Sequence, residues 1–318
     1  MKHFGRNFAL FTILIAFLLI PVSAATALIP GGQVVGMQLS DGTVTVAAID
    51  ETLGKSAKTA GLKTGDKILT VEGVAVSGPE DIRSLLEVCD GTVDLTIRRD
   101  GKEKTIRFSP AVTENGPRLG VYLKEGTAGI GTITYYDPQK GTFGALGHGV
   151  NTPGGKPVTM KTGQIFEATV LSVKKGKIGT PGQLVGAIAD PEGMGSLSKN
   201  TSRGIFGKTA TPDAAPIPIG QAKTGKATIR STIDQQGLRE YSVEILKIYP
   251  GATKEGRNLL IRVTDPQLLE TTGGIVQGMS GSPIIQDGKL IGAVTHVLVN
   301  DPTTGYGIFI ENMLNAAA

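Results

Sequence analysis

The sequence lacks tryptophan and has a single cysteine, few aromatic residues and little net charge. The lone Cys89 allows no internal disulfide and no metal site built from a cysteine cluster. A formal net charge of +4 is too small to indicate nucleic-acid binding, and no basic run is interleaved with aromatics. Histidine is also scarce, since only His3, His148 and His296 occur. These absences exclude a disulfide scaffold and leave very few candidate bases for catalysis.

Glycine, by contrast, is abundant. It accounts for 45 of the 318 residues, about twice its usual share of ~7 %. Short strands joined by tight turns fit this content better than long helices do. A chain of this length has room for two domains and a sizeable core. We therefore expect a mainly β protein with two domains.

The first 29 residues resemble an export signal or a membrane anchor. Lys2 and Arg6 precede an apolar run at 8–22, and small residues at 23–27 offer cleavage sites. Extended to Ile29, the uncharged run is also long enough to span a membrane. Both interpretations place the rest of the chain outside the cytoplasm, because positive charge stays inside.

The next segment has the pattern of a small peptide-binding module. The run AGLKTGDKILTVEGVAV, at residues 60–76, precedes an amphipathic helix expected over 79–88. On these features residues 30–110 resemble a PDZ domain. The resemblance implies that a peptide C-terminus adds as a strand beside a carboxylate-binding loop, with the helix as the other wall of the groove. The peptide-binding residues it implies are Val35, Gly36, Met37 and Leu39.

The rest of the chain is predicted to be all β. Residues 111–118 read as a linker, because Asn115, Gly116 and Pro117 interrupt the strand pattern. From 119 onward strands follow one another, with no helix of length before 311–318. We predict a domain of two packed β-barrels over 119–318.

The motif GMSGSP, at residues 278–283, is typical of a nucleophile held on a tight turn. Its glycines permit the turn and leave backbone N–H groups free to face an oxyanion, which predicts donors at Gly278 and Ser280. Serine requires a base to take its proton. His148, with glycine on both sides, is the preferred base, and a structural role for this histidine is the alternative.

A catalytic histidine is oriented by an acid, and three aspartates are candidates for it. Asp190 and Asp287 lie in turn sequences, where aspartate has a sufficient structural role. Asp265 ends an expected strand ahead of the loop that leads to the serine, which places it well to reach a cleft. Asp265 also precedes a proline, so a capping role stays open.

Two long segments carry a family resemblance. They are FGALGHGV, at residues 143–150, and the stretch from Thr264 to Met313, which includes GMSGSPIIQDGKLIGAVTHVLVNDPTTGYGIFIENM. Both closely resemble the stage IV sporulation protein B peptidases, and the order of leader, PDZ domain and peptidase fits as well. The resemblance implies a serine endopeptidase with the triad His148, Asp265 and Ser280, which needs neither metal nor cofactor.

The resemblance also implies a setting. The family works in the intermembrane space around a developing endospore. It cuts the extracytoplasmic part of a membrane-bound regulator that restrains an intramembrane protease, and this release allows a late sigma factor to be processed. Its members also cleave themselves near the N-terminus. The implied partners are therefore a protein substrate, a PDZ ligand peptide and, through the N-terminal segment, a membrane.

The peptidase segment is more distantly similar to the chymotrypsin-like fold, with two departures. Met279 stands where that fold usually has aspartate, and Asp265 precedes the serine by only 15 positions (280 − 265). In that fold the strand after the nucleophile hairpin borders the specificity pocket. His296 lies on this expected strand, so we predict that it lines the pocket, and a structural histidine is an equal alternative.

Two other functions fit parts of the sequence. A quality-control protease also joins a PDZ domain to a trypsin-like one, although there the PDZ domain usually follows the protease. A non-catalytic adaptor would use the PDZ domain alone, which the complete set of His148, Asp265 and Ser280 argues against.

Overall fold

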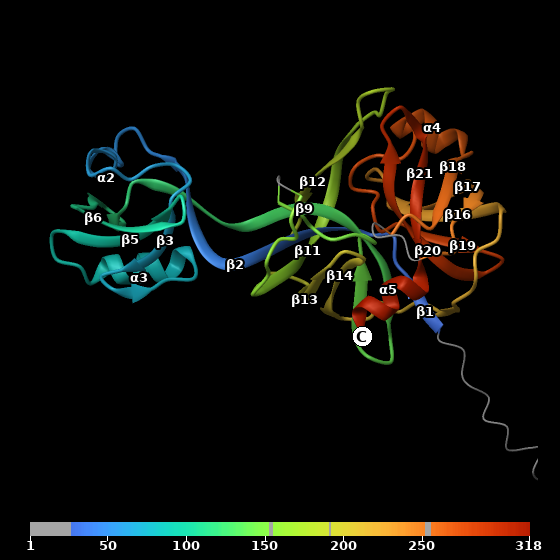
Figure 1. Cartoon of the computed structure of the whole chain (residues 1–318), viewed down its shortest axis with the longest axis horizontal. Coiled ribbons are helices and arrows are strands. Elements are labelled where there is room, and N and C mark those ends of the chain that lie inside the picture. The colour runs from blue at the N-terminus through green and yellow to red at the C-terminus, as the bar shows by residue number, and fades with distance from the viewer. Residues whose placement is uncertain (1–26, 153–154, 191, 252–255) are drawn as a thin grey trace, which may run out of the picture.

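The computed structural model describes residues 27–152, 155–190, 192–251 and 256–318. These residues form a small lobe and a larger lobe, joined by two long antiparallel strands, β2 (Val34–Ile49) and β9 (Val121–Asp137) (Figure 1). The mainly β prediction is confirmed. Residues 1–26 of the predicted leader lie outside the described residues. No helix in the described part of the chain is long and apolar enough to cross a membrane.

The small lobe is a sheet flanked by two short helices. Besides the second half of β2, its elements are α2 (Lys55–Thr59), β3 (Lys67–Val71), β4 (Val74–Ala75), α3 (Pro79–Glu87), β5 (Val93–Arg99) and β6 (Lys102–Phe108). Pro79 opens α3 at a position that needs no N–H donor, and Asp81 accepts hydrogen bonds from the N–H groups just before it. Ile82 and Leu86 bury the inner face of α3 in the core of the lobe.

A buried ion pair fixes the turn before β3. Asp66 is 1 % exposed, and Arg99 donates to its two carboxylate oxygens from Nε and Nη2 at 2.6 Å each. The N–H of Lys63 donates to the same carboxylate at 2.8 Å. Burial works to raise the pKa of Asp66, but these hydrogen bonds together outweigh it and hold the pKa below its usual value.

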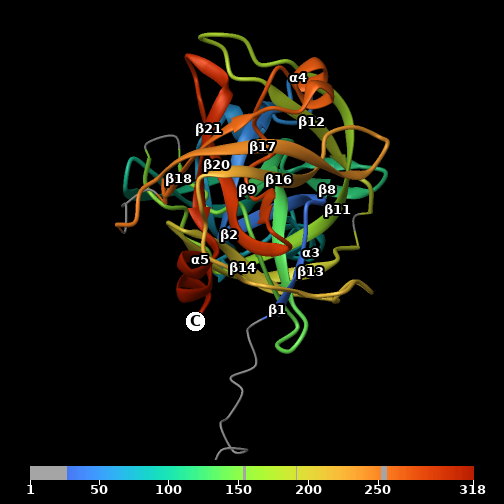
Figure 2. The same cartoon turned by 90° about the vertical axis from the view of Figure 1, so that its right-hand side faces the viewer.

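The large lobe contains two closed barrels. Together with β2 and β9, the N-terminal barrel consists of β10 (Thr142–Ala145), β14 (Gly204–Thr209), β13 (Gly195–Thr201) and β11 (Thr162–Lys174). Three further strands pair at its margins, β1 (Ala27–Pro30), β12 (Gln183–Ile188) and β15 (Ile217–Pro218). The C-terminal barrel consists of β16 (Gly225–Thr232), β17 (Leu238–Ile248), β18 (Leu259–Val263), β21 (Asp301–Phe309), β20 (Lys289–Leu298) and β19 (Pro283–Gln286), in order of pairing. Two helices complete the lobe, α4 (Pro266–Thr272) and α5 (Ile310–Ala317) (Figure 2).

Both predicted barrels close. In the N-terminal one, the pairing of β9 with β2 completes the ring β2-β9-β10-β14-β13-β11. The far ends of β2 and β9 continue from this barrel into the small lobe. The predicted linker at 111–118 is also structured, because it forms a hairpin of β7 (Ala111–Thr113) and β8 (Gly116–Arg118). β8 packs against α3.

The structure corrects the predicted start of the PDZ domain at residue 30. β1 pairs with β9 and β15, and β2 as far as Ser40 pairs with β11 of the large lobe. Ile29 and Met37 pack in one cluster with Ile133 and Phe143, far from the small-lobe core. That core begins at Val44. The small lobe is therefore inserted between two strands of the peptidase sheet, and its boundary falls inside β2.

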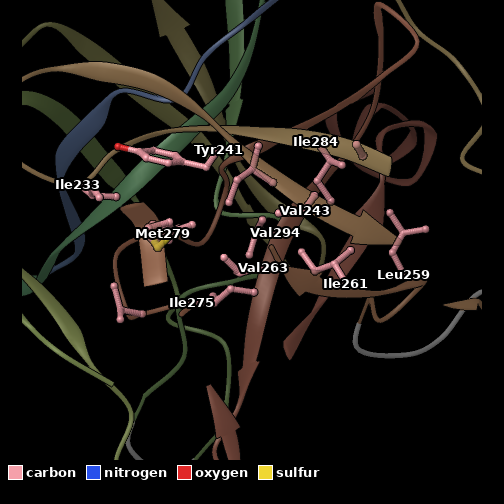
Figure 3. Packing of buried hydrophobic residues seen from close by; sticks show 14 of the residues in the cluster. Ile233, Tyr241, Val243, Leu259, Ile261, Val263, Ile275, Met279, Ile284 and Val294 are labelled. Atoms are coloured by element: carbon pink, nitrogen blue, oxygen red, sulfur yellow. The ribbon is translucent and has the colours of Figure 1, made fainter. Parts of the chain in front are cut away.

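Apolar side chains that alternate along β17 and β18 fill the C-terminal barrel (Figure 3). Val243 and Ile261 face inward there, together with Val294 of β20. Met279, which precedes the predicted nucleophile, is fully buried in the same cluster. The core thus holds the loop that carries Ser280, and this accounts for an apolar residue at position 279.

Candidate active site

The structure holds Ser280 on a tight turn, as its glycines predict. Gly278 and Gly281 both have a φ of 99°, a conformation that glycine adopts without strain. A Cβ at Gly281 would lie 2.0 Å from the carbonyl oxygen of Thr132, so this position admits only glycine. The N–H of Met279 donates to the oxygen of Val276 and closes the turn on its other side.

The predicted oxyanion donors are free to act. Within the described part of the chain, neither the N–H of Gly278 nor that of Ser280 donates to another residue. Both residues line a pocket of about 570 Å³, which reaches the solvent. Unoccupied N–H groups beside a serine hydroxyl are what an acyl-transfer site requires.

His148 lines the same pocket. It follows Leu146 and Gly147, which have φ values of 68° and 69°. The left-handed backbone is ordinary for glycine but costs energy at leucine, and such strain is common at functional sites. Asn200 holds the segment beyond the histidine through bonds to both main-chain groups of Val150.

The hydrogen bonding of His148 suits a base. Its Nδ1 lies 2.9 Å from the carbonyl oxygen of Gly149, which can only accept, so Nδ1 carries the proton. The neutral ring then has its lone pair on Nε2. Burial lowers the pKa of His148, and the bond to Gly149 opposes this with a smaller effect. The imidazole is therefore neutral at neutral pH.

His296 also lies in this pocket, on β20. Its ring centroid is 5.3 Å from that of His148, with the two planes tilted by 38°. Both histidines, Ser280 and Thr295 line this pocket. The structure thus brings together three of the four side chains that the sequence singles out for catalysis and specificity.

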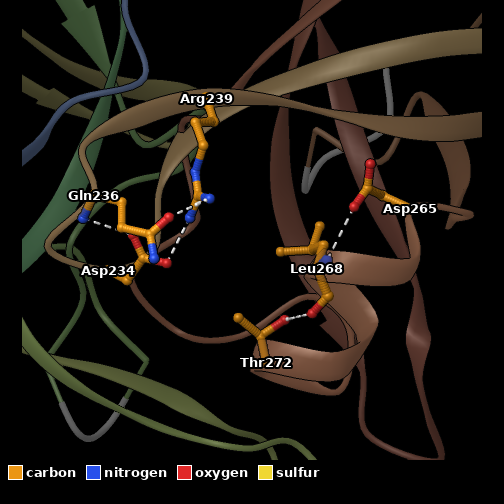
Figure 4. A network of polar contacts seen from close by, with 6 residues as sticks. All are labelled: Asp234, Gln236, Arg239, Asp265, Leu268 and Thr272. Atoms are coloured by element: carbon orange, nitrogen blue, oxygen red, sulfur yellow. Dashed lines mark hydrogen bonds and ion pairs between the residues drawn. The ribbon is translucent and has the colours of Figure 1, made fainter.

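Asp265 is the side chain that it does not bring there. The carboxylate begins α4 as its N-cap, accepting from the N–H of Leu268 at 3.0 Å and from that of Ser242 at 3.3 Å (Figure 4). Asp265 is absent from the pocket lining, as are Asp190 and Asp287. The orienting role of Asp265 stays a prediction, and in this arrangement the carbonyl of Gly149 holds the imidazole instead.

The hydroxyl of Ser280 is at rest. Its Oγ donates to the carbonyl oxygen of Thr295 at 2.9 Å. A carbonyl can accept this hydrogen bond but cannot remove the proton, so the serine in this arrangement is not activated. Rotation of the side chain toward an imidazole is needed before it can attack.

The structure corrects the predicted PDZ groove. Val35, Gly36, Met37 and Leu39 are buried in the peptidase sheet, where they pair with β9 and β11. They have no free strand edge to offer a peptide. The error has a simple cause. β2 continues through the polar stretch at 40–43 from one lobe into the other, and the apolar run before that stretch resembles the one after it.

A groove of about 590 Å³ lies in the small lobe instead, between α3 and the start of β9. Its walls include Ile82 and Leu86 of α3, facing Leu119, Gly120 and Val121. Within the described chain the N–H groups of Leu119 and Gly120 make no hydrogen bond, so they can bind a carboxylate. The sequence signal for this loop is the run LGVYL at 119–123, which sequence reasoning assigned to the peptidase domain.

No metal centre is formed by the described side chains, because no group of three or more His, Cys, Asp or Glu lies close enough together.

Comparisons with known proteins agree with this architecture. The SpoIVB peptidase S55 family matches residues 115–314, and the PDZ domain family matches residues 34–109. The "Putative zinc metalloprotease Atu1380" of Agrobacterium fabrum (strain C58) is 34% identical over 89 residues. Those residues are 28% of this chain and 22% of that protein, so the chain matches about a fifth of that relative's length.

Similar solved structures include two proteases and a PDZ domain. The active form of the Rv3671c protease from M. tuberculosis is 16% identical with a TM-score of 0.36, covering 60% of this chain and 73% of that one. The thermostable serine protease AL20 from an extremophilic microorganism is 12% identical with a TM-score of 0.35, covering 64% and 93%. The PDZ domain of the SdrC-like protein from Listeria monocytogenes is 18% identical with a TM-score of 0.22, covering 25% and 85%.

The match over 115–314 spans more than half of the chain and includes the turn of Ser280 and the segment of His148. The fold that carries them is mainly β, with a PDZ domain and two β-barrels. The chain therefore belongs to the SpoIVB peptidase S55 family, as a serine peptidase with an N-terminal PDZ domain.

Proposed function

We propose that this serine peptidase is exported and membrane-associated, and that it acts in the intermembrane space during endospore formation. Its substrate is the extracytoplasmic part of a membrane-bound regulator, whose cleavage triggers intramembrane proteolysis and activates a late sigma factor. It also cleaves itself near its N-terminus. The family match supports the setting, and the charged and apolar N-terminal sequence, residues 2–29, supports export.

One observation carries the chemical part of the proposal. Ser280, on its glycine turn, shares a pocket with His148, and the N–H groups of Gly278 and Ser280 are unoccupied. Nucleophile, base and oxyanion donors therefore meet in one place that a peptide can enter.

The mechanism follows from these positions. Ser280 leaves the carbonyl of Thr295, and His148 takes its proton at Nε2 as Oγ attacks the scissile carbonyl. The N–H groups of Gly278 and Ser280 hold the oxyanion. His148 then returns the proton to the leaving amine, and water hydrolyses the acyl-enzyme by the same route. The chemistry uses no metal or cofactor.

Asp265 is proposed to stabilise the imidazolium, as the family resemblance implies. For this its carboxylate has to leave the N–H groups of Leu268 and Ser242. The substrate-bound enzyme is then expected to have a different start to α4 from the resting one.

We propose that His296 lines the pocket for the residue before the scissile bond and favours a polar side chain there. Its place on the pocket wall beside Thr295 supports this role. The test is the cleavage-site preference of His296→Gln in a peptide library. An unchanged preference would overturn the assignment.

A second function is favoured by the resting hydroxyl of Ser280. An adaptor that binds membrane-protein termini through the groove at α3 has no need of an activated serine. This candidate predicts that the purified protein never reacts with reagents that modify catalytic serines.

Covalent labelling separates the two functions. The full chain is treated with a fluorophosphonate and its intact mass is measured beside that of Ser280→Ala. A single adduct on the wild type and none on the variant is the expected result. The absence of an adduct on both proteins, also after a C-terminal peptide is added for the groove, would overturn the peptidase mechanism in favour of the adaptor.

A further inference from the structure

Thr132 connects three parts of the active site, although it lies outside the pocket. It is a fully buried residue of β9, the strand that crosses both lobes. Its Oγ1 donates to the carbonyl of Gly278 at 2.7 Å, and its N–H donates to the carbonyl of Ser280 at 3.1 Å. Its own carbonyl accepts from the N–H of Leu146, two residues before the base.

The bond to Gly278 supplies a restraint that the turn itself lacks. Glycine has no Cβ to restrict its dihedral angles, so the peptide plane after Gly278 can rotate more freely than at another residue. A hydrogen bond to the carbonyl in that plane fixes its direction. The second bond, from the N–H of Thr132 to Ser280, fixes the other end of the same turn.

The close packing of β9 against the nucleophile turn also supports a role for Thr132 in holding the active site. The carbonyl of Thr132 is so near Gly281 that a Cβ there would lie 2.0 Å from it. This carbonyl also receives the N–H of Leu146. The turn that carries the nucleophile and the segment that carries the base are therefore both held against one residue of β9.

We propose that Thr132 is a positioning residue for the peptidase reaction, which aims the oxyanion donors of the 278–280 turn through its hydroxyl. The inference rests on Ser280 acting as the nucleophile. Thr132 touches no substrate. Its hydroxyl acts by keeping the N–H groups of Gly278 and Ser280 directed at the developing negative charge, which matters most in the transition state.

The sequence supplies a matched control on the same strand. Thr134 is also fully buried, two residues further along β9. Its Oγ1 has no hydrogen-bond partner among the described residues. Thr132→Val and Thr134→Val each remove a buried hydroxyl from β9, but only the first removes a bond to the turn.

The test measures hydrolysis of a p-nitrophenyl ester by the full chain, with kcat expressed per site that reacts with a fluorophosphonate. Thr132→Val is expected to lower kcat about 10- to 100-fold, with KM changed by less than about threefold. Binding of a boronic acid, whose adduct mimics the tetrahedral intermediate, should weaken by a similar factor. Thr132→Ser, which keeps the hydroxyl, and Thr134→Val should both stay within about threefold of the wild type.

Several outcomes would overturn the proposal. They are an unchanged kcat in Thr132→Val, an effect on KM alone, or an equal loss in Thr134→Val. If too little Thr132→Val folds for the assay, Thr132→Ala also removes the hydroxyl, and a wild-type kcat in that variant would overturn the proposal. Ser280→Ala distinguishes a failure of the Thr132 proposal from a failure of the proposed function. Ester hydrolysis that survives in this variant refutes the assignment of Ser280 as the nucleophile.

Discussion

The hydroxyl of Ser280 donates its hydrogen bond to the main-chain carbonyl of Thr295, the residue that immediately precedes His296 in the same pocket. Peptide hydrolysis requires this bond to be exchanged for one to an imidazole. The resting and reactive arrangements therefore differ by a rotation of one side chain, together with whatever orients the base. A substrate strand that paired with the Thr295 carbonyl would displace the hydroxyl of Ser280 from it.

We predict that kcat/KM for peptide cleavage rises with pH through a midpoint below 6.5, the ordinary pKa of histidine. Burial destabilises the imidazolium of His148 and lowers its pKa, so the active neutral base persists to a lower pH than usual. Activity is lost as the pH falls through that lowered value. A pH profile of the wild type measures the midpoint.

The control for this profile is His296→Gln, because His296 is the titratable group that faces His148 at 5.3 Å. The low midpoint should remain in this variant. A midpoint above 6.5, or one that disappears with His296, would contradict the assignment of His148 as the base.

We predict that Asp265→Ala lowers the free energy of unfolding by about 1 kcal/mol, because α4 loses its N-cap. Asp265→Asn keeps an acceptor for the N–H of Leu268 and should lose only a few tenths. Denaturant unfolding of both variants tests this order. Equal stabilities would show that the cap contributes little.

The same Asp265→Asn protein tests the orienting role. A negative charge beside the imidazolium predicts a fall in kcat of about 10⁴-fold when it is removed, at nearly constant stability. A kcat near that of the wild type would mean that Asp265 only begins a helix.

We predict that Val121→Glu weakens binding of C-terminal peptides by about tenfold or more, because it places a carboxylate in the groove beside α3. Hydrolysis of a small ester should not change. Binding is measured by fluorescence polarisation on the full chain with Ser280→Ala, so that the peptide is not cut. Lys124→Glu, on an exposed face of the same strand, is the control and should bind normally.

Gly36→Glu tests whether the peptide binds in the groove beside α3 or at residues 35–39, as the sequence predicted. Gly36 is buried in the peptidase sheet, and a Cβ there already lies 3.0 Å from the side chain of Ile188. The variant should therefore destabilise the large lobe. A stable Gly36→Glu that has lost peptide binding alone would restore the original assignment to residues 35–39.

We predict that Asp66→Asn destabilises the small lobe by about 3 kcal/mol, because Arg99 is left with an uncompensated charge at a largely buried site. The pKa of Asp66 is lowered on folding, so the stabilisation is present above its ordinary value of 3.8 and is lost as the pH falls through the lowered value. Unfolding measured from pH 7 to pH 2 should show the difference between wild type and variant shrinking at the acid end. A difference that stays constant over this range would contradict the role of the carboxylate charge.

The active site was predictable where local sequence decides geometry. Gly278 and Gly281 permit the positive φ that a tight turn around Ser280 needs, and the scarcity of histidine left His148 and His296 as the candidate bases. The structure places all three in one pocket. Asp265 could not be assigned in this way, because an aspartate before Pro266 is as suitable for starting a helix as for orienting a base.

The peptide groove could not be predicted, because it depends on pairing between distant strands. The runs VVGMQL at 34–39 and LGVYL at 119–123 both combine apolar residues with one glycine, so either fits a carboxylate-binding strand. β2 pairs with β9 along both lobes, and β11 covers the other edge of β2 only in the first run. The second run therefore keeps a free strand edge beside α3, whereas the first run has none. The local sequence of the two runs does not reveal this difference.

The pairing of β1 with β9 and β15 also fixes how the molecule is attached to whatever precedes it. Ala27 lies at the large lobe, and the peptide groove lies in the small lobe at the other end of the two long strands (Figure 1). A membrane anchor upstream of Ala27 would thus tether the protein by its catalytic half. The PDZ domain would then project away from the bilayer and present its groove to termini that extend from the opposite surface.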